Sequence, residues 1–252
     1  MSSLVAIPAA LAVGATLGLL GVGGSILTVP ILVYLLDIAP RTATTMSLVV
    51  VAVASLAAAL LHARERHVRL AVAAHFVTTG APAAYLGGRL SHQLSEPALL
   101  LGFGAFMLAA AIAILRKRDD APPAHTQRHA VMAALSGAVI GLVTGILGAG
   151  GGFLVVPALA LLVPLPMREA IGTSLVVITA NAAVGLVARS GAVELPLELT
   201  ALFASMALVG AVIGHTLGKR LPVAMLRRLF AGLVLLVAVY MIWKNLGAAN
   251  VA

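Results

Sequence analysis

Two glycine-rich motifs interrupt long apolar stretches of the chain. Residues 18–30 read GLLGVGGSILTVP, and residues 145–157 read GILGAGGGFLVVP. Glycine permits a sharp turn and close approach of a ligand to the backbone, and a helix that follows such a turn offers free N–H groups and a positive dipole end to an anion. A lone motif would more often serve close helix packing, but a symmetric pair favours anion binding. The predicted anion-binding backbone comprises Gly21, Gly23, Gly24, Ser25, Gly148, Gly150, Gly151 and Gly152.

Hydroxyl and amide side chains follow each motif, near the start of the next apolar segment or within it. They are Thr45, Ser47, Thr173, Ser174 and Asn181. Ser174 and Asn181 would share one face of a helix, because their spacing is close to two helical turns. Inside a membrane such groups either hold helices together by hydrogen bonds or contact a ligand. The sequence leaves both interpretations open.

Basic and titratable side chains form a third set of candidates. Arg41 and Arg168 stand at equivalent places before the hydroxyl-rich segments, where they could attract an anion or simply anchor helix ends in water. His75 and His215 lie in apolar segments and are candidate proton relays, although neither has an acidic neighbour in the sequence. No histidine pair has a convincing metal-ligand spacing, so neither a metal site nor a cofactor is expected.

The acidic residues bear on the driving force. All 8 of them fall in loops or at segment ends, whereas a proton- or sodium-driven pump often places a carboxylate inside the membrane. An inside-negative potential favours the exit of an anion by about 2.3 kcal/mol per charge per 100 mV. The sequence therefore favours export driven by the charge of the cargo, with histidine-mediated proton coupling as the alternative.

The composition requires lipid around most of the chain. Hydrophobic residues make up 62% of the 252 residues and charged residues 10%, whereas soluble domains carry about 25% charged residues. Cysteine is absent, which excludes disulfides and thiolate metal sites. The net charge of +8 comes from short basic loops between apolar runs, a pattern that indicates membrane topology rather than nucleic-acid binding. We expect a multi-pass protein of the bacterial inner membrane whose partners are lipid and a small anionic substrate; its oligomeric state is left open.

Eight apolar segments are expected along the chain, and the first and fifth are too long for one crossing of about 20 residues. Both are also broken by the glycine motifs. A polar stretch at 117–129 divides the chain into a first half, 1–116, and a second half, 130–252. The expected segments are 4–36, 42–61, 70–88, 97–115, 130–165, 170–188, 197–216 and 223–243.

The two halves are related in sequence. A shift of 127 positions aligns the two glycine motifs, and it also pairs Arg41 with Arg168 and Ser47 with Ser174. The paired Gly-x-Gly-Gly motifs, each ending in Val-Pro and followed by an arginine and a Thr/Ser-Leu helix start, resemble the TauE/SafE sulfite exporter family over nearly the whole chain. One departure is Ser25, where the second half has glycine; it adds a hydroxyl to the first turn.

The resemblance implies an all-α polytopic membrane protein with eight hydrophobic segments in a 4+4 duplication. It also implies export or uptake of sulfite, sulfonates and related anions. The favoured function is secondary transport of such an anion across the inner membrane, with export preferred. Two alternatives are an accessory subunit of a membrane complex and, less favoured, a membrane-embedded enzyme; no enzyme motif is found.

The distribution of the 16 Lys and Arg residues favours one topology. If the two broken segments are re-entrant hairpins, twelve basic residues lie on one side of the membrane and four on the other, as the positive-inside rule requires. Eight full crossings would give nine against seven. The sequence therefore predicts six crossings, both termini outside, and two inverted halves.

Overall fold

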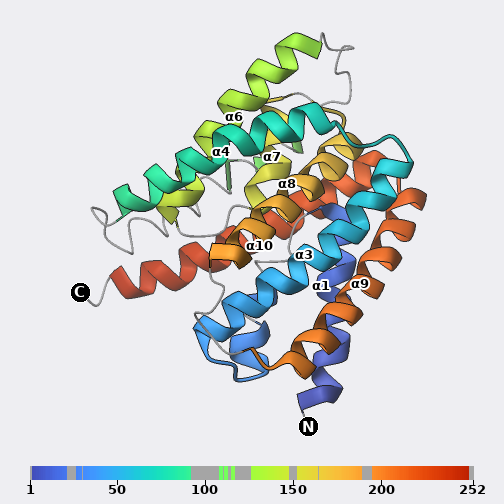
Figure 1. Ribbon diagram of the computed structural model, residues 1–252, viewed down its shortest axis with the longest axis vertical. Helices are drawn as coiled ribbons and strands as arrows, with labels where there is room; N and C mark the ends of the chain where they lie inside the picture. Colours follow the sequence, from blue (N-terminus) through green and yellow to red (C-terminus); the bar gives the residue numbers. More distant parts are fainter. Residues whose placement is uncertain are drawn as a thin grey trace.

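The computed structural model describes residues 2–21, 27–29, 31–91, 108–109, 111–112, 115–116, 126–147, 152–163, 165–188 and 195–249. All regular secondary structure in these residues is helical (Figure 1). The elements are α1 (Ser2–Leu20), η1 (Ile31–Leu35), α3 (Pro40–Arg64), α4 (Leu70–Ser91), α6 (Thr126–Leu147), α7 (Gly152–Leu161), α8 (Met167–Ala188), α9 (Leu197–Arg220) and α10 (Val223–Ala249).

Proline marks several helix starts. Pro40 occupies the first turn of α3, Pro196 caps α9, and Pro222 directly precedes α10. Proline fits the first turn because its missing N–H is not needed there and its φ is already helical. The observed helices lie within or close to the expected segments, although α6 begins at Thr126, inside the stretch predicted as linker. The segment expected at 97–115 lies mostly outside the described residues.

The helices are suited to a bilayer. Three of those described are long and apolar enough to cross a membrane: Thr42–Arg64, Met167–Val187 and Leu197–Arg220. Shorter apolar helices cover Ala6–Leu20, Leu70–Leu86 and Val131–Val143. Many large apolar side chains face outward on these helices, which is favourable where lipid takes the place of water. The fold is therefore that of a polytopic α-helical membrane protein.

Close backbone contact joins α1 to α9. A Cβ added to Gly14 would lie only 1.9 Å from the carbonyl oxygen of Ala207, and one added to Gly18 would lie 2.0 Å from that of Ala211. From the other side, a Cβ on Gly214 would lie 2.1 Å from the carbonyl oxygen of Ala15. Small residues on both helices allow this approach, which provides dispersion contacts where no hydrophobic effect acts between helices.

The same contact recurs between α4 and α6. A Cβ on Gly141 would lie 2.2 Å from the carbonyl oxygen of Gly80. Residues 14 and 141, like residues 80 and 207, are 127 positions apart. Helix α1 thus packs on α9, and α6 packs on α4, through contacts of the same kind. Helices α3 and α8 also contact each other, and Ser55 Oγ lies 2.8 Å from Thr179 Oγ1 across that contact.

Three helix junctions meet at one end of the bundle, at the upper right of Figure 1. Arg69, between α3 and α4, makes a bidentate ion pair with Glu169 at the start of α8, with N–O distances of 2.8 and 3.0 Å. Arg168 donates to the carbonyl oxygen of Leu221, beyond the end of α9, at 2.9 Å. Lys219 near the end of α9 pairs in turn with Glu65 at the end of α3.

Candidate functional site

The first glycine motif breaks its helix inside the bundle. Gly21 ends α1 with a left-handed φ of +66°, and its N–H donates to the carbonyl oxygen of Leu17 at 2.8 Å. A Cβ at this position would stand 2.9 Å from Ser174 Oγ and 3.0 Å from Ile171 Cγ2. Glycine is therefore required here both for its φ and for space.

Ser174 connects this turn to α8 of the other half. Its Oγ lies 2.7 Å from the carbonyl oxygen of Ile171 and 3.3 Å from that of Gly21. A hydroxyl has one proton, so the two carbonyls compete for it. Reorienting this hydroxyl would present a donor at the turn.

The hydroxyls predicted from the sequence are buried. Thr45, Ser47, Thr173 and Ser174 are each at most 4% exposed, while Asn181 is half-buried on α8. Thr173 Oγ1 accepts a hydrogen bond of 3.0 Å from the N–H of Arg69, so it has a structural task at the α3–α4 junction.

Several predicted residues belong to parts of the chain that the structure does not describe or describes only in the backbone. Gly152 is the first residue of α7, and Arg41 lies in the first turn of α3. Gly23, Gly24, Ser25, Gly148, Gly150 and Gly151 lie outside the described residues.

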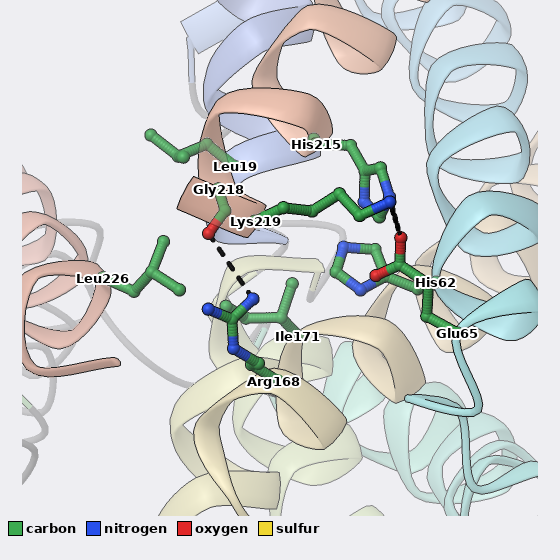
Figure 2. Close-up of a pocket in the computed structure, with 10 residues that line it drawn as sticks. Leu19, His62, Glu65, Arg168, Ile171, His215, Gly218, Lys219 and Leu226 are labelled. Atoms are coloured by element: carbon green, nitrogen blue, oxygen red, sulfur yellow. Dashed lines mark hydrogen bonds and ion pairs between the residues drawn. The ribbon is translucent and has the colours of Figure 1, made fainter. Parts of the chain in front are cut away.

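A small polar pocket opens next to the Gly21 turn (Figure 2). The end of α1 contributes Gly18 and Leu19 to its wall, so the pocket and the turn are contiguous along the chain. In this conformation it has room for about one water molecule. Its lining residues are Gly18, Leu19, His62, Glu65, Arg168, Ile171, His215, Gly218, Lys219 and Leu226.

Two histidines are buried against each other in the pocket wall. His62 on α3 is 7% exposed and His215 on α9 is 4% exposed. Their ring centroids are 4.4 Å apart, with the rings nearly perpendicular at 78°. His215 Nε2 lies 3.1 Å from Glu65 Oε1, whereas its Nδ1 has no hydrogen-bond partner within the part of the chain that the structure describes. Neither ring nitrogen of His62 makes a hydrogen bond of good geometry, although the backbone of Gly18 lies near the ring.

Glu65 is the acidic centre of this group. It accepts hydrogen bonds from Lys219 and His215, and His67 Nδ1 lies 3.4 Å from its Oε2. Burial raises the pKa of Glu65, but the bonds from Lys219 and His215 outweigh burial and bring the pKa below its ordinary value of 4.5. The carboxylate is therefore ionised at neutral pH.

Arg168 supplies the second fixed positive charge. Its guanidinium donates to the carbonyl oxygen of Leu221 at 2.9 Å and to that of Gly218 at 3.5 Å. Lys219 stands at the mouth, with its side chain 52% exposed. Two cations and two imidazoles therefore share the pocket with one carboxylate, a balance that favours a negatively charged ligand.

The structure separates the two histidines predicted as relays. His215 lies in the pocket, whereas His75 is exposed on α4, with its Nδ1 2.6 Å from the carbonyl oxygen of Ala71. Sequence reasoning missed His62 and Glu65 entirely. A local signal existed, because these two residues are three positions apart and share a helix face, but their partner on α9 is 150 positions away.

Comparisons with known proteins agree on one family. The sequence profile described as Sulfite exporter TauE/SafE matches residues 6–241. A probable membrane transporter protein of Xylella fastidiosa strain Temecula1 is 33% identical over 242 residues, which cover 92% of each chain. The probable membrane transporter protein YunE of Bacillus subtilis is 26% identical over 214 residues, covering 75% of this chain and 78% of YunE. No solved structure matches the chain significantly.

The length of these matches and the apolar helices point to the same conclusion. The match to the family profile covers nearly the whole chain, and the Xylella relative exceeds 30% identity over the same extent. Three of the helices described above are long and apolar enough to cross a bilayer. The chain is a multi-pass transporter of the inner membrane, and it belongs to the TauE/SafE sulfite exporter family.

Proposed function

We propose that this transporter carries a small sulfur oxyanion, either sulfite or an organosulfonate, from the cytoplasm outward. The observation that supports this best is the pocket beside the Gly21 turn, whose lining includes Arg168 and Lys219 with Glu65 as its one carboxylate. Such a charge balance concentrates anions at the entrance. Behind the pocket, the hydroxyl of Ser174 lies at the Gly21 turn and can serve as a donor to an oxyanion that has left water.

We assign six crossings and two re-entrant hairpins to the chain, with the halves inverted. The support is geometric. The α3–α4 junction, the start of α8 and the end of α9 meet at one end of the bundle, whereas eight straight crossings would put the first of these on the opposite side from the other two. Helix α3 also begins on the lower side of Figure 1, where α1 starts.

The positive-inside rule assigns the shared end to the cytoplasm, because Arg64, Arg66, Arg69, Lys219 and Arg220 cluster there. The pocket would then face the cytoplasm and load substrate from inside. The two glycine turns, one from each half, would meet the anion further in, as in other transporters built from inverted repeats with broken helices.

Flux in liposomes tests this function. Purified protein is reconstituted without partners, the vesicles are loaded with sulfite, methanesulfonate or sulfate, and efflux is followed with an imposed potential at equal pH on both sides. We expect saturable efflux of at least one sulfur oxyanion, accelerated by an inside-negative potential, as the charge of the cargo requires. If none of these anions leaves the vesicles faster than it leaves protein-free vesicles, the proposal is contradicted. The alternative of an accessory subunit would then be favoured.

A further inference from the structure

The histidine pair has unused hydrogen-bonding capacity. His215 Nε2 faces Glu65 at 3.1 Å and therefore carries a proton, which leaves Nδ1 as the basic nitrogen of that ring. Among the described residues, this Nδ1 and both ring nitrogens of His62 are buried without a hydrogen bond of good geometry, although the backbone of Gly18 lies near the His62 ring. A buried polar atom left unpaired costs about 1–3 kcal/mol. Three such atoms in one pocket wall indicate that the wall is shaped for something that binds there.

Charged and titratable side chains from several helices face the histidine pair. Glu65 and His67 face it from the end of α3 and the following turn, Lys219 from α9, and Arg168 from α8. The end of α1 contributes only backbone and Leu19, and α10 contributes only Leu226. A proton on the pair would add a third positive charge against one carboxylate. Because two charged rings 4.4 Å apart would repel each other, the pair has capacity for one proton.

We infer that this pocket binds a small oxyanion together with one proton, and that the His62–His215 pair takes up that proton. The proton comes from bulk water at the mouth and is held on His215 Nδ1 or on a ring nitrogen of His62. The new N–H group then donates to the anion, beside Arg168 and Lys219. This inference rests on the proposed function, because it names the first binding step of the transport cycle. The proton serves binding only and returns to the cytoplasm when the anion leaves the pocket, so the charge that crosses the membrane is still that of the anion.

The pocket must widen before it admits an ion of several atoms. Lys219 can swing out, since its side chain is half exposed and is held by Glu65 alone among the contacts described for it. The bond from Arg168 to Gly218 is at the long limit for a hydrogen bond, at 3.5 Å, so this arm of the guanidinium can turn at small cost. An incoming anion then takes the place of Glu65 as the partner of Lys219, and of Gly218 as a partner of Arg168.

The expected signature is linkage between pH and affinity. If one proton is taken up with each anion, the association constant rises about tenfold per unit fall in pH while the pair is titrating. Methanesulfonate is the suitable probe, because it is the anion of a strong acid and keeps its charge throughout. Calorimetry on the full chain in detergent, between about pH 5 and 8, measures the slope. Repeating it in two buffers with different heats of ionisation counts the protons, and we expect about one per anion.

Variants locate the proton. We expect His62→Gln and His215→Gln to flatten the pH slope, whereas His75→Gln, exposed on α4 and outside the pocket, should keep it. Lys219→Gln should weaken binding about tenfold at every pH, through loss of a charge-assisted contact, while the slope stays. Gel filtration confirms that each variant is folded, and the two-buffer proton count on the unaltered protein needs no variant.

The inference would be overturned by methanesulfonate binding that takes up no proton, or by an unchanged slope in both pocket variants. Absence of methanesulfonate binding at every pH would overturn it as well. Flux in liposomes combined with any of these results would leave the proposed function standing. Proton-linked binding without flux would instead contradict the proposed function while the binding site survives.

Discussion

Replacing Gly14 with alanine should push α1 away from α9. The new Cβ would stand 1.9 Å from the carbonyl oxygen of Ala207, whereas an ordinary contact starts at 3.4 Å, so the helices must separate by about 1.5 Å. The obstacle is backbone and cannot rotate away. Overpacking of this kind costs about 1–3 kcal/mol, and this contact belongs at the upper end. The higher helix propensity of alanine offsets about 1 kcal/mol of this cost. We therefore expect the free energy of unfolding to fall by about 2 kcal/mol.

Gly232→Ala is the matched control, because a Cβ on this residue of α10 would have nothing within 4 Å. Only the propensity term applies there, so this variant should be slightly more stable than the parent. Thermal unfolding in detergent, followed by gel filtration of the heated sample, gives the midpoints, with about 2–4 °C expected for each kcal/mol. A Gly14→Ala protein that melts at or above the parent would refute the close-contact reasoning.

The close contact between α4 and α6 extends this test. Gly141→Ala disrupts the equivalent contact with Gly80, because the new Cβ would lie 2.2 Å from the carbonyl oxygen of Gly80. It should lower the midpoint by a similar amount. Because the two contacts lie in different helix pairs, the losses of the double variant should add to within about 0.5 kcal/mol. Strong non-additivity would mean that the two contacts do not act separately.

Three further predictions follow from the topology, the turns and the pocket. Single cysteines at residues 1 and 126 of this cysteine-free chain should be labelled from opposite sides of the membrane; labelling from the same side would exclude the hairpins. Gly24→Leu and Gly151→Leu should abolish flux with normal membrane insertion, measured by efflux and by yield in the membrane fraction, and normal efflux from both would rule out the turns as the site. Because the pKa of Glu65 is below 4.5 in the fold, its stabilisation is present above that pH and is lost as the pH falls through the lowered pKa. Glu65→Gln should therefore lower the melting midpoint at pH 7, and the difference from the parent should shrink as the pH falls below 4.5; a difference that does not change with pH would contradict an ionised Glu65.

The helices were predictable because each apolar run is long and punctuated by proline or glycine. The break of α1 at Gly21 was also predictable, since a helix rarely continues through such a cluster of glycines. Burial of Ser47 and Ser174 followed from their places in apolar segments. In each case the signal lies within a few residues of the feature it describes.

The pocket was not predictable in the same way. The spacing of His62 and Glu65 shows that they share a face of α3, and that of His215 and Lys219 shows the same on α9, but no local signal says that these two faces meet. That pairing depends on how two helices 150 positions apart pack. The distribution of basic residues gives indirect support for this meeting of α3 and α9. It favours the hairpin topology, which puts the ends of both helices on one side of the membrane, whereas eight crossings would not.

The exchange of partners between halves also sets an order of assembly in the cell. Helix α1 has its close-packing partner in α9, and residues 14 and 207 are separated by 193 positions of chain. At a synthesis rate of about 5–20 residues per second, α1 waits about 10–40 s for α9 to leave the ribosome. During that interval the glycine face of α1 must be covered by lipid, by the insertion machinery or by a temporary neighbour. A ribosome that stops after the first half therefore leaves an unpaired membrane helix, a substrate for quality-control proteases rather than a small working transporter.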